Sequence, residues 1–282
     1  MDHPGRRLVV IRGGADLASA VAHRLFREGR AVVIMEEPEP RAVRRRMAFA
    51  QAVFAGETTV EGVRAVRTEA GPALERLLES REAIPLVVDP TGEAVRTLGP
   101  TVLVDARMRK KERSDSSVAE APLVIGLGPG FLAGREAHVV IETARGPELG
   151  RVITRGEALP YDGMPADLGG FTRERYLYAP VGGVFRTPLD IGAPVEAGQA
   201  MGEVAGVPLV ARVGGTIRGI LKDGVRVSAG QKLVDIDPRE EAVLAGISEK
   251  ARVIAEGVAA AIAAWEASAS RGQDRPGPCR ET

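Results

Sequence analysis

Short apolar runs separated by polar turns recur through the first half of the chain. Residues 8–11 form an apolar run rich in β-branched side chains, as expected of a buried parallel strand. Apolar positions spaced three and four residues apart over 17–26 predict a helix with one buried face. A second apolar run at 31–35 predicts the next strand. The pattern predicts a βαβ unit whose first turn, at Gly13 and Gly14, carries almost no side chains.

The same patterns continue to residue 158 and predict a larger sheet. Loose alternation over 58–67, with Gly62 at a bend, predicts a pair of strands. Further strands are expected at residues 84–88, 101–104, 123–125 and 138–142, and helices at residues 41–54 and 72–78.

The glycine turn is a candidate anion site. Glycine lets backbone N–H groups approach a phosphate, and the helix dipole favours negative charge there. The dinucleotide-binding fingerprint is imperfect, because Ala15 stands at its second glycine. Asp16 is expected to cap the helix, and Glu36 lies at the spacing of a carboxylate that reaches a ribose hydroxyl. Cofactor contacts are therefore predicted at Arg12, Gly13, Gly14, Asp16 and Glu36, and the alternative is a plain βαβ unit that binds no nucleotide.

A second glycine-rich turn follows the strand at 123–125. It contains Gly126, Gly128 and Gly130, and it is predicted either to contact the same ligand or to be a tight structural turn. Asp105 ends a predicted strand, where a carboxylate can point into the crevice of an open sheet. Arg44 and Arg145 are further candidates for ligand oxygens, and the alternative for Arg44 is a solvated basic helix face.

The second half of the chain contains an internal repeat with an offset of 32 residues. Val181-Gly-Gly matches Val213-Gly-Gly, and Ala197-Gly-Gln matches Ala229-Gly-Gln. Short strands with glycine turns predict two half-barrels around a pseudo-two-fold axis. A helix with one apolar face is expected at 238–268.

Composition excludes several classes of protein. The chain has 282 residues, with 38 basic and 38 acidic side chains, so no global charge attracts nucleic acid or an anionic membrane. No uninterrupted apolar run approaches 18 residues and no signal peptide is recognisable, so a cytoplasmic protein is expected. The single cysteine, Cys279, rules out an internal disulfide, and the three histidines lack metal-ligand spacing, so no metal site is predicted.

Two resemblances refine the picture. The repeat resembles the biotinyl/lipoyl barrel-sandwich fold, but the hairpin at 204–210 has no carrier lysine, so no covalent biotin or lipoate is expected. The segments 12–25, 49–63, 104–111, 124–134 and 142–152 together resemble the YqeB-type proteins of the selenium-dependent molybdenum hydroxylase system. That resemblance implies an XdhC-like Rossmann part and a role in maturing a molybdenum hydroxylase.

The expected fold is α/β, with a Rossmann-like parallel sheet, a small barrel-sandwich domain and a C-terminal helix. The expected boundaries are a ligand-binding domain at 1–158, a linker at 159–178, the barrel-sandwich at 179–237, the helix at 238–268 and a disordered tail at 269–282.

Three functions remain open at this point. The first is an accessory or maturation factor that binds a molybdopterin-type cofactor or a dinucleotide, with a hydroxylase or another maturation protein as partner. The second is an NAD(P)-dependent oxidoreductase. The third is a non-catalytic scaffold that docks the hydroxylase to a selenium or sulfur donor. No catalytic residue is identified, and whether the chain is an enzyme or a homo-oligomer is left open.

Overall fold

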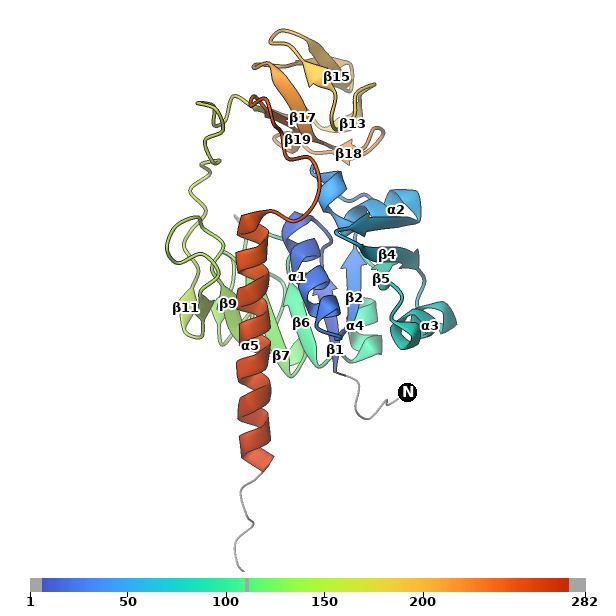
Figure 1. Cartoon of the computed structure of the whole chain (residues 1–282), viewed down its shortest axis with the longest axis vertical. Coiled ribbons are helices and arrows are strands. Elements are labelled where there is room, and N and C mark those ends of the chain that lie inside the picture. The colour runs from blue at the N-terminus through green and yellow to red at the C-terminus, as the bar shows by residue number, and fades with distance from the viewer. Residues whose placement is uncertain (1–6, 110–111, 274–282) are drawn as a thin grey trace, which may run out of the picture.

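The computed structural model describes residues 7–109 and 112–273. A nine-stranded sheet forms the larger part, and two smaller antiparallel sheets lie beyond one end of it (Figure 1). The large sheet has the order β10 (Val152–Ile153), β9 (Val139–Ile141), β7 (Leu123–Leu127), β6 (Val102–Asp105), β1 (Leu8–Arg12), β2 (Ala31–Glu36), β5 (Ile84–Val88), β4 (Val63–Thr68) and β3 (Glu57–Val60).

Strand β1 occupies the centre of this sheet and pairs in parallel with β2 and β6. Its residues Leu8 to Ile11 are all buried, because helices cover both faces of the sheet. The chain runs from β1 to β2 on one side and later returns to β6 on the other. The carboxyl ends of these three strands therefore border the point where the strand order reverses.

Helices pack on both faces of the large sheet. Helices α1 (Asp16–Arg27) and α5 (Glu249–Gln273) share one apolar cluster, which includes Leu25 and Ile254. Helices α3 (Pro72–Ser80) and α4 (Glu93–Leu98) contribute Leu74 and Val95 to the cluster on the other face. The core therefore consists of two apolar layers on either side of the strands.

The predicted fold class is wrong. The large sheet is mixed rather than parallel, because β3 pairs antiparallel with β4 and β10 pairs antiparallel with β9. The segment after it forms separate antiparallel sheets, and helices are few, so the structure is not a Rossmann-like domain followed by a barrel-sandwich. Apolar runs reveal which residues become strands, but they carry no information on the direction in which an edge strand pairs.

The antiparallel part, here called the β unit, spans β12 to β19. One sheet has the order β12 (Tyr176–Tyr178), β19 (Lys232–Asp237), β17 (Gly215–Ile220) and β14 (Pro194–Val195). The other has the order β16 (Val207–Val210), β15 (Ala200–Val204), β13 (Gly183–Arg186) and β18 (Arg226–Val227). A two-stranded sheet of β8 (Leu132–Ala133) and β11 (Gly156–Glu157) lies beside the large sheet.

The 32-residue repeat is visible in the strand pairing of the β unit. Strand β13 of the first repeat pairs with β18 of the second, and β17 of the second pairs with β14 of the first. The matched glycines Gly183 and Gly215 both have positive φ, at 158° and 147°. A side chain at Gly215 would lie 2.3 Å from the carbonyl oxygen of Asp237, so only glycine fits there.

The expected strand pair at 58–67 forms, whereas two expected helices differ from their predicted bounds. The β pair at 58–67 is confirmed as β3 and β4, with Glu61 and Gly62 at positive φ in the turn. The helix expected at 41–54 is instead broken into η1 (Arg45–Met47), η2 (Phe49–Gln51) and α2 (Ala52–Ala55). The last helix begins at Glu249, and residues 238–248 precede it without helical structure. Cys279 and most of the predicted tail lie outside the described residues.

Helix α5 is long and apolar enough, by length and composition alone, to cross a membrane. Its segment Glu249–Ser270 has a mean hydropathy of 1.2 and is 39% buried. In the structure it packs on α1 and on the large sheet, and it continues past the sheet edge (Figure 1). A core helix of a globular protein can have the same length and hydropathy.

A short segment, residues 39–46, joins the large sheet to the β unit. The Glu39 side chain accepts a hydrogen bond from Arg226 N, and Val43 O accepts one from Ile220 N at 2.8 Å. Arg45 donates to Ile220 O at 2.8 Å, and Arg46 donates to Ile191 O at 2.7 Å. The segment therefore fixes the position of the β unit above the large sheet.

Candidate functional site

A cleft of about 940 Å³ lies at the carboxyl ends of β1, β2, β5 and β6. Its walls include the turns that follow these four strands. Gly230 and Gln231 of the β unit and Tyr161 of the connecting segment complete it. Open α/β sheets bind ligands at this edge, which makes the cleft the candidate site.

The glycine turn lies in the cleft wall, as predicted, but its N–H groups already have acceptors. Gly13 N donates to Met35 O at 2.8 Å, and Gly14 N donates to Glu36 Oε2 at 2.7 Å. Glu36 Oε1 accepts a second bond, from Glu37 N. The structure therefore brings Gly13, Gly14 and Glu36 together, with the Glu36 carboxylate on the N–H group expected to face a phosphate.

Burial raises the pKa of Glu36 above its ordinary value, against the opposing effect of the two backbone N–H donors. The carboxylate also faces a narrow turn. A side chain at Gly14 would lie 3.2 Å from Glu36 Oε2 and 3.0 Å from Ala50 N. The turn therefore needs glycine for close packing as well as for any ligand.

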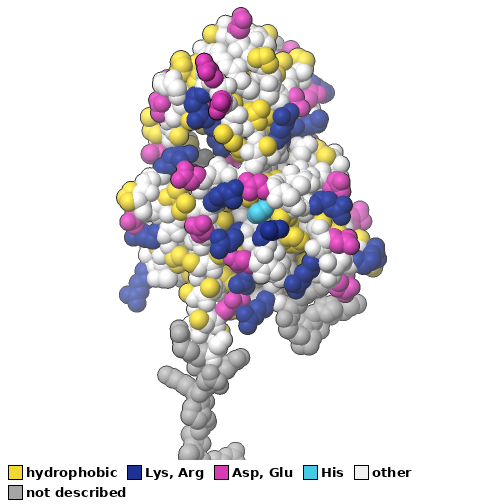
Figure 2. All heavy atoms as spheres, in the orientation of Figure 1, with side chains coloured by type: hydrophobic (Ala, Val, Ile, Leu, Met, Phe, Trp, Pro, Cys, Tyr) yellow, Lys and Arg dark blue, Asp and Glu magenta, His cyan; other side chains and the backbone are white. Residues whose placement is uncertain are grey.

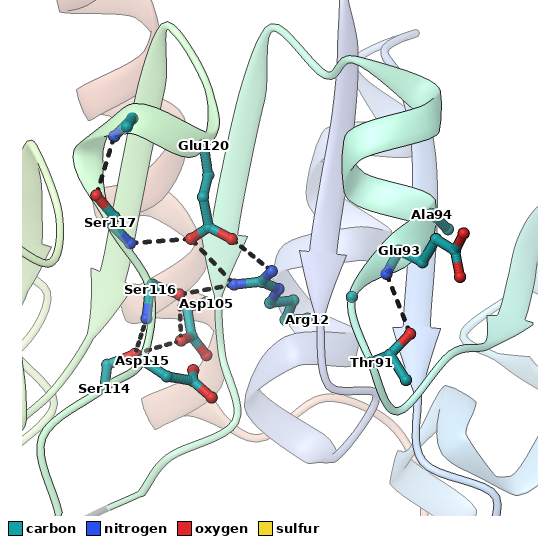
Figure 3. Close-up of polar contacts among 12 residues, drawn as sticks. Arg12, Thr91, Glu93, Ala94, Asp105, Ser114, Asp115, Ser116, Ser117 and Glu120 are labelled. Carbon is teal, nitrogen blue, oxygen red and sulfur yellow. Dashed lines mark hydrogen bonds and ion pairs between the residues drawn. The ribbon is translucent and has the colours of Figure 1, made fainter.

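Arg12 lines the cleft but is already paired. Its guanidinium binds both oxygens of Glu120, at 2.6 and 3.1 Å, and it donates to Ser116 Oγ at 2.9 Å (Figure 3). Glu120 also accepts from Ser117 N, in a capping box that starts the turn η3 (Val118–Glu120). Arg12 thus links β1 to the loop after β6.

Asp105 lies at the end of β6 and is 1% exposed. It accepts hydrogen bonds from the hydroxyls of Ser114 and Ser116, at 2.8 and 2.9 Å (Figure 3). It also accepts bonds from the Arg107 guanidinium, at 2.6 and 2.9 Å. Burial alone would raise the pKa of Asp105, but these bonds and the Arg107 charge hold it below its ordinary value. Asp105 thus binds side chains of the segment that follows β6 rather than facing the cleft.

Two arginines that the sequence analysis did not select are the free cations of the cleft. Arg41 and Arg96 line it, are exposed, and form no ion pair or hydrogen bond within the described chain. The sequence did not distinguish them, because Arg41 lies just before the run of arginines at 44–46 and Arg96 is an isolated arginine in the short helix α4. Four acidic side chains of the cleft wall have no ion pair among the described residues, namely Glu36, Glu37, Asp89 and Glu112.

Asp16 and Arg44 lie beside the cleft, at the boundary with the β unit. Asp16 is the first residue of α1, and no side chain caps this helix, so the predicted Asp16 cap is wrong. Its carboxylate lies 3.5 Å from Arg44, which also reaches Asp235 of β19 at 3.4 Å. Arg44 is thus neither on a solvated face nor in the cleft wall.

The second glycine turn has an internal packing role. A side chain at Gly126 would overlap the Phe131 ring at 2.4 Å, and one at Gly128 would overlap Thr143. Gly130 faces the backbone of Glu112. These three glycines and the exposed Arg145 lie outside the described lining of the cleft, and their contacts with a ligand stay a prediction.

Asp89 and Glu142 are carboxylates with structural partners. Asp89 accepts bonds from the N–H groups of Thr91, Gly92 and Ala94 at the start of α4. Burial opposes these bonds, but they lower the pKa of Asp89. Glu142 is fully buried and binds three backbone N–H groups, which a sequence reading could not foresee. The described residues contain no group of three potential metal ligands.

No family model matches the chain. The chain is 42% identical over 266 residues to "Uncharacterized protein YqeB" of Escherichia coli (strain K12), a match that covers 92% of this chain and 48% of that protein. The chain therefore spans about half the length of the curated relative that it matches.

Two solved structures show weak similarity in fold. An aspartoacylase family protein from Mesorhizobium loti is 14% identical with a TM-score of 0.27, over 83% of this chain and 86% of that one. The product-bound ectoine utilization protein EutE (DoeB) from Ruegeria pomeroyi is 11% identical with a TM-score of 0.25, over 82% and 84%. At these TM-scores nothing about activity follows.

Proposed function

We propose that the chain is an accessory or maturation factor of a selenium-dependent molybdenum hydroxylase and binds a phosphorylated cofactor, of molybdopterin or dinucleotide type, in the cleft. The observation that carries the binding part is the pair of unpaired arginines, Arg41 and Arg96, in the cleft wall. Arginine presents a planar fork of donors that matches phosphate oxygens. The hydroxylase part rests on the sequence resemblance, and the expected place of action is the cytoplasm.

The cleft is suited to holding a ligand that is anionic at one end and rich in donors at the other. Glu36 and Glu37 offer carboxylate oxygens near the glycine turn, where hydroxyl or ring N–H groups can donate. Among the described residues that line the cleft there is no histidine, cysteine or lysine. The hydroxyl of Thr91 donates to Asp89, but this carboxylate also accepts backbone N–H groups and its pKa is lowered by them, so it is a weak base. Binding is therefore favoured over covalent chemistry.

An NAD(P)-dependent oxidoreductase is the second candidate. The observation in its favour is the position of Glu36, which ends β2 and contacts the glycine turn, as an acidic residue that reads a ribose hydroxyl does. The two backbone N–H groups on its oxygens compete with such a hydroxyl. NADH is therefore included as a competing probe in the experiment below.

The proposal is tested by titrating the purified chain with molybdopterin cytosine dinucleotide under anaerobic conditions and measuring affinity by calorimetry. Saturable binding is expected, with a rise in stability of about 2.7 kcal/mol at a ligand concentration 100-fold above Kd. Arg41→Ala and Arg96→Ala are each expected to weaken binding about tenfold, the effect of losing about 1.4 kcal/mol of a charge-assisted bond.

Arg27→Ala is the matched control, because Arg27 is exposed, ends helix α1 and lies outside the described lining of the cleft. It should leave the affinity unchanged. Tight saturable binding of NADH with no binding of the molybdopterin compound would replace the proposal with the oxidoreductase. Absence of binding by both compounds would contradict a cofactor site in the cleft.

A further inference from the structure

Four cationic side chains converge on one buried carboxylate at the boundary between the large sheet and the β unit. Asp235 Oδ2 lies 3.1 Å from Arg218 Nη2, 3.4 Å from Arg44 Nε and 3.5 Å from Lys232 Nζ. Asp235 Oδ1 pairs with Arg175. Asp235 is 0% exposed and Arg175 is 1% exposed. We call these five residues the Asp235 cluster.

The charges of the Asp235 cluster do not balance. Its nearest additional carboxylates are Asp16, which pairs with Arg44, and Asp237, which pairs with Arg218 and with the outer Arg239. Cations therefore outnumber carboxylates even when both of these are included. Burying uncompensated charge is costly, because the interior cannot replace the lost hydration.

Two donors of the cluster also lack acceptors. Arg175 Nε and Arg218 Nε are buried and have no hydrogen-bond partner among the described atoms. Buried donors in folded proteins are normally satisfied. A bound anion would compensate the excess of positive charge and accept hydrogen bonds from the two unsatisfied guanidinium donors.

The cluster is reachable from solvent through its outer members. The side chains of Arg44 and Lys232 are 21% and 28% exposed. Gln231 precedes Lys232 in the chain, Ala15 precedes the Asp16 that pairs with Arg44, and both line the cleft. An anion could therefore approach the cluster from the cleft end of α1.

We propose that the Asp235 cluster is a binding site for a tetrahedral oxyanion, sulfate or phosphate in kind, held by Arg44, Lys232 and the arginines behind them. The anion is either free in solution or the phosphate end of the compound bound in the cleft. This proposal does not depend on the function proposed above, because it needs no particular cofactor and no hydroxylase.

Lys232 makes the site responsive to pH. Its amine lies 3.4 Å from the centre of the Tyr176 ring and faces Arg44, Arg175, Asp16 and Asp235. Arg218 binds the same oxygen of Asp235. Burial first, with the nearby arginines, outweighs the two aspartates and lowers the pKa of Lys232 to about 7. The amine is therefore fully charged only below that pH. Oxyanion binding should strengthen as the pH falls through 7.

Sulfate is the probe, because it does not titrate in this range. Calorimetry at constant ionic strength with chloride as the reference salt is expected to show saturable binding that weakens severalfold between pH 6 and pH 8. Lys232→Met should weaken sulfate binding at least tenfold at pH 6 and abolish most of the pH dependence. Lys222→Met, at an exposed lysine of the same β unit, should change neither.

Arg44→Met is the second variant, in case Lys232→Met fails to fold, and it should also weaken sulfate binding at least tenfold. Non-saturable stabilisation by sulfate, or equal affinity in both cluster variants and the control, would overturn the site. Displacement of sulfate by molybdopterin cytosine dinucleotide would support the cluster as the phosphate end of the cleft. Simultaneous binding would support a site for a free oxyanion.

Discussion

Asp105 and Glu36 end the two strands that flank β1, and their electrostatic environments are opposite. Asp105 is surrounded by the donors of Arg107, Ser114 and Ser116, which lower its pKa. Glu36 has only backbone donors, and burial raises its pKa. A carboxylate at a strand end thus serves either to order a loop or to face the cleft, and its donors decide which.

Asp105→Asn is expected to lower the free energy of unfolding by about 3 kcal/mol at pH 7, because it leaves Arg107 without its buried partner. The folded-state pKa of Asp105 lies below its ordinary value of 3.8, so the stabilisation that the ionised carboxylate provides is complete at pH values above 3.8. This stabilisation is lost as the pH falls from 3.8 through the folded-state pKa of Asp105. The difference in unfolding free energy between the wild type and Asp105→Asn should therefore shrink over that pH range. Urea unfolding at pH 7 and at pH 3 measures both effects.

Asp115→Asn is the matched control for this experiment. Asp115 also pairs with Arg107, but its side chain is 59% exposed. The expected loss is under about 1 kcal/mol, as for exposed ion pairs. Equal losses in the two variants would contradict the anchoring role of Asp105.

At the scale of elements, helix α5 covers one face of the large sheet through a close backbone contact. A side chain at Gly257 would lie 2.2 Å from the carbonyl oxygen of Gly150, and one at Gly150 would lie 2.7 Å from that of Val253. The two glycines let the helix approach the turn after β9. The sequence pattern predicted an apolar helix face here but could not predict this contact.

Gly257→Ala should therefore destabilise the protein by about 1–3 kcal/mol, the usual cost of overpacking. The direction of the stability change is informative, because alanine is favoured over glycine in a free helix by about 1 kcal/mol. Ala260→Ser, at an exposed position of the same helix, should change stability by less than about 0.5 kcal/mol. Thermal unfolding compares the stability of the wild type and the two variants. A Gly257→Ala variant that is more stable than the wild type would show that α5 does not pack as described.

At the scale of the whole molecule, residues 39–46 connect the cleft to the β unit. Arg41 of this segment lines the cleft, while Arg45 and Arg46 bind carbonyl groups of the β unit. Gly230 and Gln231 of the β unit close the cleft from above. The position of the β unit therefore sets the shape of the cleft.

Arg45→Met is expected to loosen the β unit, because Ile220 O loses its 2.8 Å donor and Asp190 loses its ion pair. The radius of gyration from small-angle X-ray scattering should rise, and ligand affinity in the cleft should fall severalfold. Arg186→Met is the control, since Arg186 is 61% exposed and pairs only within the β unit. Unchanged scattering and affinity in Arg45→Met would mean that the remaining contacts suffice to hold the β unit.

The sequence alone determined the local elements and one part of the site. Apolar runs in the sequence predict the strands β1, β2, β5, β6 and β7 and the hairpin of β3 and β4. Glycines and residue spacing predict the turn that brings Gly13, Gly14 and Glu36 together. All these signals are properties of residues close together in the chain. Only the tertiary structure decided the antiparallel pairing of β10 with β9, the broken helix at 45–55 and the partners of Arg12, Arg44 and Asp105. The partners of Arg12 and Arg44 lie 108 and 191 positions away in the chain, at Glu120 and Asp235. A one-dimensional pattern contains no distance between such residues, so charge pairing and strand direction emerge only when the chain is folded.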